Sequence, residues 1–183
     1  ADLSAGLAEV VKGGFIADPR ILAIVEEEES AVQEPGTAQL REVIERKIAI
    51  KAEVVAADLR ESNLREILNY GHTLGHAIEH HEGYRMRHGE AVAIGMVYAA
   101  ELAHRTGRID AALLERHRYV LGLLGLPTTY STATFDELLA ALRRDKKTRG
   151  ATLRFVVLDG LAQPSRLEGP DESLLREAYA ALA

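Results

Sequence analysis

The chain has 183 residues, 47% of them hydrophobic, and a formal net charge of −6 at pH 7. This length and composition predict one compact domain, and the negative charge argues against a nucleic-acid partner because phosphates require a basic face. The absence of cysteine excludes disulfides and thiolate ligands, so a metal site would need histidine and carboxylate ligands.

The N-terminal part of the chain predicts two helices. Asp2 or Ser4 can cap the first one, and apolar residues recur at helical spacing over residues 3–15. The Asp-Pro pair at 18–19 indicates the start of the second helix, because Pro favours the first helical position. The acidic run at residues 26–29 is predicted to be a solvated face.

A long amphipathic helix is predicted after the break at Pro35 and Gly36, and neither Gly nor Pro interrupts it. Its predicted buried positions are Leu40, Val43, Ile44, Ile48, Lys51, Val55 and Leu59. Lys51 is therefore predicted to be a buried cation, and a buried cation usually faces an anion.

Two further helices, over residues 69–81 and 89–104, are predicted on either side of a short polar turn at residues 82–85. The second of them is rich in Ala and other apolar residues, so we expect it to run through the core. Helical patterns also cover residues 110–124 and 134–144.

The pattern changes near the C-terminus. Residues 152–158 and 161–163 predict a β-hairpin around Asp159-Gly160, because Asp-Gly favours tight turns. A helix over residues 171–182 ends the chain. No internal repeat or linker is found, so the predicted fold class is mainly α, a single multi-helix domain over residues 1–183 with one small β-hairpin near residues 152–167.

No segment predicts a membrane partner. The longest largely apolar run, residues 91–100, is shorter than the roughly 20 residues that cross a bilayer, and the N-terminus lacks the layout of a signal peptide. We therefore expect a cytoplasmic protein. The chain begins with Ala1 and enters a helical pattern almost at once, which suggests a fragment of a longer protein.

Three histidines are candidates for a metal site. His72 and His76 are four residues apart on one predicted helix, which places both rings on the same face, and His88 follows after a turn. A catalytic zinc commonly takes three protein ligands and keeps one position open, so two histidines and Glu9 would suffice. By spacing alone, His72 and His76 are the natural pair. The other histidines are predicted to be structural: His80, His81, His104 and His117.

Glycines and cations accompany these histidines. Gly71, Gly75 and Gly89 each lower helix stability by roughly 1 kcal/mol relative to Ala, so we expect close packing or ligand approach there. Lys12 lies three residues after Glu9, although an exposed salt bridge is an alternative interpretation for Lys12 and for Arg65. Lys146 and Lys147 are also consistent with an ordinary basic helix terminus, which the helix dipole favours.

Residues 65–79, REILNYGHTLGHAIE, closely resemble the signature of 3-dehydroquinate synthases, the second enzymes of the shikimate pathway of aromatic amino acid biosynthesis. Three other segments occur in the order of that family: GLAEVVK at residues 6–12, HGEAVAIGM at residues 88–96 and DKK at residues 145–147. The resemblance covers essentially the whole chain and implies the C-terminal domain of the dehydroquinate synthase-like fold.

By this resemblance, the ligands of a catalytic zinc, with cobalt as the alternative metal, would be Glu9, His72 and His88. The substrate pocket would be lined by Lys12, Lys51, Arg65, Asn69, His76 and Lys146 or Lys147. The resemblance therefore changes the pairing of the histidines, because His76 becomes a pocket residue and not a ligand.

The family substrate is 3-deoxy-arabino-heptulosonate 7-phosphate, whose carboxylate and phosphate account for a cationic pocket in an acidic protein. The implied reaction begins with oxidation by NAD, while zinc polarises the oxygen and acidifies the neighbouring C–H; phosphate elimination, reduction, ring opening and aldol closure follow. Members of the family carry an N-terminal nucleotide-binding α/β domain, so the resemblance implies that NAD is bound mainly there; this chain has no Gly-rich phosphate loop. We expect the fragment alone to be inactive and the full-length enzyme to be a homodimer.

Other functions are consistent with parts of the pattern. Related sugar phosphate cyclases share nearly this pocket, and metal-dependent alcohol or glycerol dehydrogenases also use spaced histidines, although their acidic ligand is typically Asp and not Glu as at position 9. Helical phosphohydrolases need an adjacent His-Asp pair, which this sequence lacks. A non-catalytic helical interaction domain would bind no stoichiometric zinc.

Overall fold

The computed structural model describes residues 2–58, 64–149 and 152–183, and within these it leaves out the side chains of residues 58, 64 and 144–149. Helices dominate, which confirms the mainly α class, and a two-stranded sheet is the β-structure of the described part. The elements in chain order are α1 (Asp2–Ile16), α2 (Pro19–Glu27), α3 (Glu29–Val32), α4 (Ala38–Asp58), the 3-10 helix η1 (Leu64–Asn69), α5 (His72–His81), α6 (His88–Arg105), α7 (Ala111–Leu123), α8 (Phe135–Arg149), β1 (Arg154–Leu158), β2 (Pro164–Glu168) and α9 (Glu172–Ala180).

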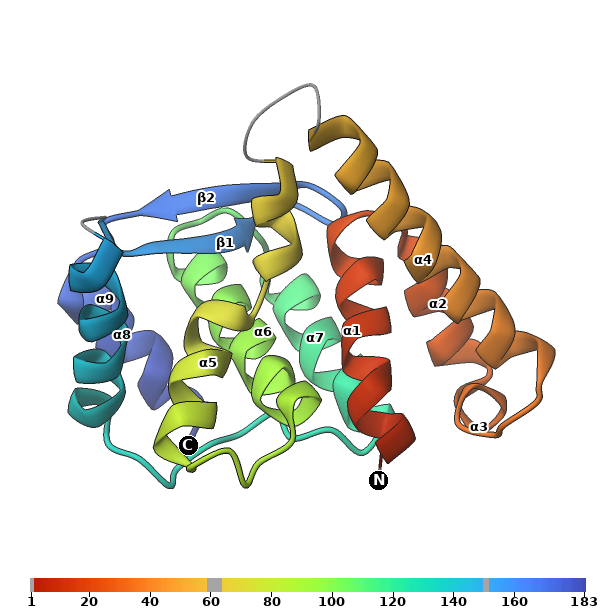
Figure 1. Cartoon of the computed structure of the whole chain (residues 1–183), viewed down its shortest axis with the longest axis horizontal. Helices are drawn as coiled ribbons and strands as arrows, with labels where there is room; N and C mark the ends of the chain where they lie inside the picture. Colours follow the sequence, from red (N-terminus) through yellow and green to blue (C-terminus); the bar gives the residue numbers. More distant parts are fainter. Residues whose placement is uncertain (1, 59–63, 150–151) are drawn as a thin grey trace.

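Helix α6 is the centre of the fold. Every residue from 89 to 103 except Glu90 is buried, which confirms that this helix runs through the core. Helices α5, α1, α7 and α9 and strand β1 pack around it (Figure 1). A helix that is apolar on all sides is stable only when neighbours cover it completely, and this arrangement provides that cover.

Helices α1, α2 and α4 form the side of the molecule that carries α3 (Figure 1). The buried positions of α4 are Leu40, Val43, Ile50 and Val54, whereas Ile44 is 38% and Ile48 is 59% exposed. The prediction was therefore confirmed at Leu40 and Val43 but wrong at Ile44, Ile48 and Lys51, which are exposed. Two apolar stripes with helical spacing run along α4, and packing on α1 and α2 selects the one that the periodicity did not favour. Leu59 lies outside the described residues.

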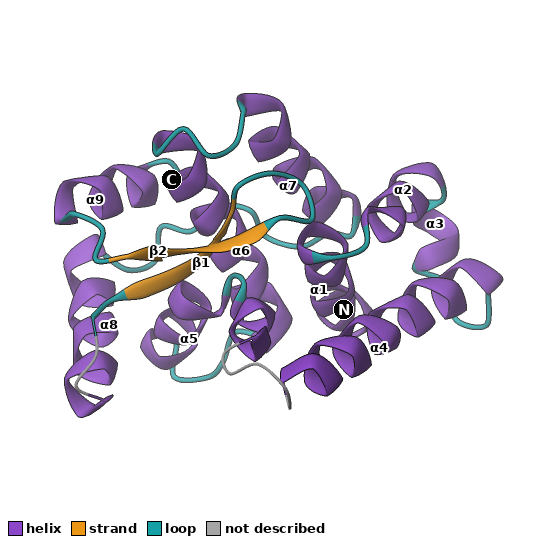
Figure 2. Cartoon of the chain, turned by 90° about the horizontal axis from the view of Figure 1, so that it is seen from above, coloured by secondary structure: helices purple, strands orange, loops and turns teal. Residues whose placement is uncertain are grey.

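The β-hairpin covers one end of the helices (Figures 1 and 2). Its strands are antiparallel, from Arg154 opposite Glu168 to Leu158 opposite Pro164. The predicted second strand at residues 161–163 was wrong, because these residues belong to the connection. The Asp159 N–H donates to the Gln163 carbonyl oxygen at 2.9 Å, and the Ala162 N–H donates to the Phe15 carbonyl oxygen at 2.9 Å. A tertiary contact with α1 thus replaces the two-residue turn.

Local sequence signals set several helix boundaries. Asp18 caps α2 with Pro19 as its first residue, and Asp110 caps α7 by accepting from the Leu113 N–H at 2.8 Å. The predicted helix over residues 69–81 begins only at His72, because Gly71 has a left-handed φ of 79° and follows the 3-10 helix η1, which the sequence did not predict. In the described part, no helix combines the length and the apolar composition of a membrane span.

Candidate metal centre and substrate pocket

Close backbone contacts join α6 to α1 on one side and to the start of α5 on the other. A Cβ atom at Gly89 would overlap the carbonyl oxygen of Ala5 in α1, and one at Gly95 would overlap the carbonyl oxygen of Gly71. A Cβ at Gly75 would lie 3.2 Å from the Ala91 carbonyl oxygen. These contacts confirm the expected close packing at the glycines, and they place three candidate ligands from three different helices at one point.

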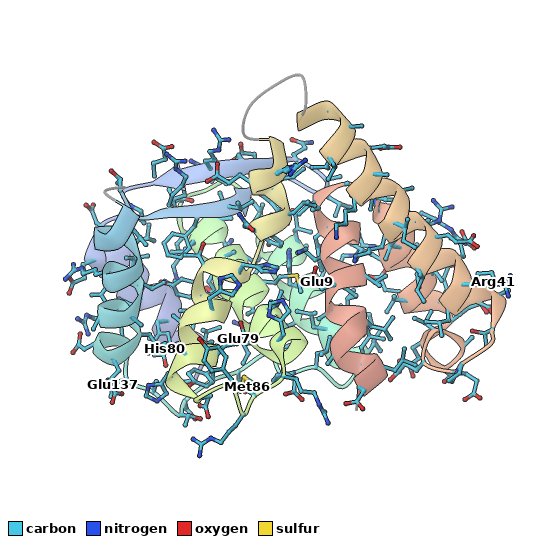
Figure 3. The ribbon with its side chains drawn as sticks, in the orientation of Figure 1. Glu9, Arg41, Glu79, His80, Met86 and Glu137 are labelled. Carbon is cyan, nitrogen blue, oxygen red and sulfur yellow. The ribbon has the colours of Figure 1, made fainter. Side chains whose placement is uncertain are left out.

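Glu9 of α1, His72 at the start of α5 and His88 at the start of α6 meet at this point. Each offers one ligand atom, and the three atoms lie within 4.8 Å of one another. Nε2 of His72 is 3.4 Å from Oε1 of Glu9, and the ring centroids of His72 and His88 are 5.2 Å apart. In Figure 3, Glu9 projects from α1 toward the side chains of α5. Glu90 fixes the start of α6 by accepting the Arg87 N–H at 3.0 Å.

The protonation of His72 leaves one nitrogen for a metal. Its Nδ1 lies 3.1 Å from the Tyr70 carbonyl oxygen, which is an acceptor only, so Nδ1 carries the proton and Nε2 has a free lone pair. Burial, followed by the nearby Lys12 charge, lowers the pKa of His72 to about 4, which keeps the ring neutral near pH 7.

Glu9 supplies the third candidate ligand atom of the metal site. Its Oε1 is buried and has no hydrogen-bond partner in the described part of the chain, yet it faces the lone pair of His72 Nε2 at 3.4 Å. Two acceptors at this distance repel each other unless a donor or a cation lies between them. Burial raises the pKa of Glu9, but the charge and hydrogen bond of Lys12, together with the nearby His72 and His88, outweigh burial, so the net pKa is lowered and the carboxylate is ionised. Two imidazoles and one carboxylate suit a divalent metal with an open coordination position.

Lys12 holds Glu9 in place. Its Nζ donates to Glu9 Oε2 at 2.8 Å and to the Leu68 carbonyl oxygen at 2.6 Å, and the residue is only 5% exposed. The alternative of an exposed salt bridge is therefore wrong for Lys12. Burial lowers the pKa of Lys12, and the neighbouring Glu9 carboxylate partly offsets this effect. Lys12 thus occupies one carboxylate oxygen and leaves the other to the histidines.

A cavity of about 220 Å³ opens beside these residues, between α1, α4 and η1. Its lining residues are Glu9, Lys12, Gly13, Ile16, Lys47, Ile50, Lys51, Leu68, Asn69 and His72. Lys51 is an exposed lining residue and not a buried cation, so that prediction was wrong in burial, although the lysine reaches the cavity. In the part of the chain with described side chains, no carboxylate forms an ion pair with Lys47 or Lys51.

Lys47 is a cavity residue that the sequence analysis did not single out. It lies one turn before Lys51 on α4, and both charges contribute to the lowered pKa of Lys12. The spacing of four residues between the two lysines was a usable signal. The predicted inward-facing positions were chosen mainly for apolar side chains, so Lys47 was passed over although it lies on the same face as Val43 and Lys51.

The other predicted pocket residues lie in different surroundings. Arg65 at the start of η1 and His76 on α5 are exposed, and neither lines this cavity. The His76 ring centroid is 5.3 Å from that of His72 and 6.0 Å from that of His88, so His76 borders the candidate ligands. Lys146 and Lys147 lie near the end of α8, where the side chains are not described.

The remaining histidines have structural surroundings or are exposed. His117 is completely buried, with Nε2 2.8 Å from the Tyr70 hydroxyl and Nδ1 2.7 Å from the Leu113 carbonyl oxygen. Its ring stacks on Phe15 with 3.7 Å between the centroids. His104 Nδ1 lies 3.2 Å from the Ile109 carbonyl oxygen. His80 and His81 are exposed.

A family model described as 3-dehydroquinate synthase C-terminal matches residues 6–148. The 3-dehydroquinate synthase of Nocardia farcinica (strain IFM 10152) is 60% identical over 182 residues, which cover 100% of this chain and 49% of that relative. The 3-dehydroquinate synthase of Thermobifida fusca (strain YX) is also 60% identical over 182 residues, again 100% of this chain, and 50% of that relative is covered. The chain spans about half the length of the curated relatives it matches.

Two solved structures resemble nearly the whole chain. One is 2-epi-5-epi-valiolone synthase from Streptomyces hygroscopicus subsp. jinggangensis 5008 with NAD+ and Zn2+ bound, with a TM-score of 0.88 and 26% identity over 98% of this chain and 51% of that chain. The other is 2-deoxy-scyllo-inosose synthase complexed with carbaglucose-6-phosphate, NAD+ and Co2+, with a TM-score of 0.83 and 27% identity over 99% and 51%. These neighbours confirm the dehydroquinate synthase-like fold.

Proposed function

The chain belongs to the 3-dehydroquinate synthase family, and we propose that it forms the metal-binding and substrate-binding half of such an enzyme. The complete enzyme would convert 3-deoxy-arabino-heptulosonate 7-phosphate to 3-dehydroquinate and phosphate, as a step of the shikimate pathway in the cytoplasm. One observation carries the proposal: Glu9 Oε1, which has no hydrogen-bond partner among the described residues, faces the free nitrogen of His72 beside a cavity lined by lysines.

Each residue of the site has a role that follows from its contacts. Glu9, His72 and His88 would hold zinc, with cobalt as the alternative, and Lys12 orients Glu9 through its Nζ. When bound, the metal would polarise an oxygen of the substrate and NAD would accept and return a hydride. The chain itself contributes binding, charge and orientation.

The cations of the cavity would bind the anionic groups of the substrate. Lys47 and Lys51 on α4 form no ion pair with a carboxylate in the described part of the chain. Both line the same cavity as Asn69 of η1. An ammonium near a carboxylate or phosphate forms a strong, charge-assisted hydrogen bond, and a partly enclosed cavity strengthens it further. Arg65, His76 and Lys146 or Lys147 would complete the substrate contacts from outside this cavity.

We further propose that NAD is held mainly by a preceding α/β domain and that the complete enzyme is a homodimer. Both solved neighbours contain NAD+, and this chain corresponds to about half of each of them. Among the alternatives, Glu9 as the acidic ligand argues against an alcohol or glycerol dehydrogenase. The relatives at 60% identity favour a 3-dehydroquinate synthase over the other sugar phosphate cyclases, to which identity is 26–27%.

The test uses the chain alone and the chain joined to the preceding half of the Nocardia farcinica relative. We expect the chain alone to bind one zinc and to release no phosphate, and the joined protein to release phosphate in a reaction that needs both NAD and metal. A seven-carbon sugar phosphate without the carboxylate serves as the control substrate for a related cyclase. Turnover by the chain alone, or turnover of the control substrate only, would contradict the proposal.

A further inference from the structure

Glu79 is a polar residue of the site region to which the function proposed above gives no role. It lies on α5, three residues after His76 and seven after His72, so it shares the face of the helix that carries both histidines. Figure 3 labels Glu79 on α5, the helix that begins at His72. Its side chain is only 13% exposed, and its Oε1 is 3.1 Å from Nδ1 of His88.

We propose that Glu79 is a positioning residue that holds His88 with its proton on Nδ1 and its Nε2 directed to the metal. This inference rests on the proposed metal site of Glu9, His72 and His88. A carboxylate at hydrogen-bond distance accepts the Nδ1 proton, which leaves the lone pair of the neutral ring on Nε2.

Each of the two histidine ligands is then oriented by a hydrogen bond from its Nδ1. His72 donates from Nδ1 to the Tyr70 carbonyl oxygen at 3.1 Å, and His88 donates from Nδ1 to Glu79 at 3.1 Å. In both rings Nε2 remains for the metal. Hydrogen bonds of this kind to the second ring nitrogen fix the orientation of a ligand and raise its basicity.

The different acceptors match the different exposure of the two rings. His72 is enclosed by its neighbours, whereas the side chain of His88 is 47% exposed. Packing therefore does little to hold the His88 ring, and a charged acceptor gives a stronger hydrogen bond than a carbonyl group. Glu79 supplies for His88 the rigidity that burial supplies for His72.

A second metal site is the competing interpretation, because ligand atoms of His76, Glu79 and His88 also lie within 4.8 Å of one another. A metal held there together with one at Glu9 would need both nitrogens of His88, as a bridging imidazolate. The direct Nδ1 contact with Glu79 requires only a proton between the two groups. The geometry therefore favours positioning.

The experiment compares Glu79→Ala, Glu79→Gln and the control Glu45→Gln, which removes an exposed carboxylate of α4 that has no partner in the described part of the chain. Cobalt binding is followed by its absorption spectrum and zinc binding by competition. We expect metal affinity to fall by about 10–100-fold in Glu79→Ala, less in Glu79→Gln, and not in Glu45→Gln. Wild-type metal affinity in both Glu79 variants would overturn the proposal.

A second readout does not depend on metal binding. In the metal-free chain at alkaline pH, nitrogen NMR of the histidine rings reports which His88 nitrogen carries the proton. We expect the Nδ1–H form in the wild type and a mixture of forms in Glu79→Ala; an unchanged Nδ1–H form in that variant would overturn the proposal. Failure of the wild type to bind metal would instead contradict the proposed function. Two metals per wild-type chain, of which His76→Ala loses one, would replace positioning with a second metal site.

Discussion

Two histidines that contact Tyr70, the mostly buried His72 and the completely buried His117, show how a candidate ligand differs from a structural residue. Burial is the main cause that lowers the pKa to about 4 for both His72 and His117. His117 has both nitrogens hydrogen-bonded and stacks on Phe15. His72 has one nitrogen hydrogen-bonded, to the Tyr70 carbonyl oxygen, while the other faces a Glu9 oxygen that accepts from no donor within the described part of the chain.

Burial and a lowered pKa therefore do not identify the functional histidine. What distinguishes the two is the incomplete set of partners around His72, because a buried polar atom without a partner is costly unless something else completes it. Tyr70 connects the regions, since its hydroxyl donates to His117 and its carbonyl oxygen accepts from His72. The site is thus built on a fully satisfied buried layer.

The largest difference between the regions should be in metal binding. We expect His72→Ala to lose zinc during gel filtration, measured by elemental analysis, and His117→Ala to retain it. Zinc at about 100 times its Kd should stabilise the wild type by about 2.7 kcal/mol, seen as a rise in Tm, and should not stabilise His72→Ala. Equal zinc retention in the two variants would remove the distinction.

The loss of folding stability should follow the opposite order, with a larger loss in His117→Ala than in His72→Ala. His117→Ala leaves a cavity beside Phe15 and a buried Tyr70 hydroxyl without its acceptor, so the free energy of unfolding should fall by roughly 3–5 kcal/mol. Urea denaturation of the metal-free protein measures this loss. His81→Ala, at an exposed position, is the control and should change stability by about 0.5 kcal/mol or less. A loss of similar size in metal-free His72→Ala would contradict the comparison.

The pH dependence of stability gives a third test. The pKa of His117 is about 4 in the folded state against 6.5 for an unperturbed ring, so between these values only the unfolded chain binds the proton. The stabilisation is complete above pH 6.5 and is lost as the pH falls toward 4, by an amount on the order of 3 kcal/mol. His117→Gln should flatten the decline, while the contribution of His72 remains. An unchanged slope in urea melts would show that His117 titrates normally.

The smallest expected effects belong to the cations of the cavity. Lys47→Ala and Lys51→Ala should each retain zinc and weaken substrate binding on the order of tenfold, about 1.4 kcal/mol, by removing a charged partner. The measurement is kcat/KM of the joined protein. Arg41→Ala removes a charge at the far end of α4 (Figure 3) and should have no effect. Zinc loss in Lys51→Ala equal to that in His72→Ala would contradict these roles.

The sequence by itself determined the features that depend on neighbouring residues. Asp110 and Pro19 set helix starts through local geometry, and the apolar composition of residues 89–103 required a buried helix. The histidine motif, with its resemblance to a known family, identified Glu9, His72 and His88, which the structure brings together. Spacing alone had favoured His76 over His88, because it does not report how the turn between two helices folds back.

Only the tertiary structure decided the features that depend on contacts between distant segments. Packing on α1 and α2 chose the buried stripe of α4, which moved Lys51 to the surface and brought Lys47 into the cavity. A hydrogen bond from Ala162 to Phe15 changed the hairpin turn. The contact between Glu79 and His88 depends on the packing of α6 against α5, which the sequence pattern does not report. In each case several arrangements satisfy the local pattern, and the free energy of packing and of polar pairing selects one.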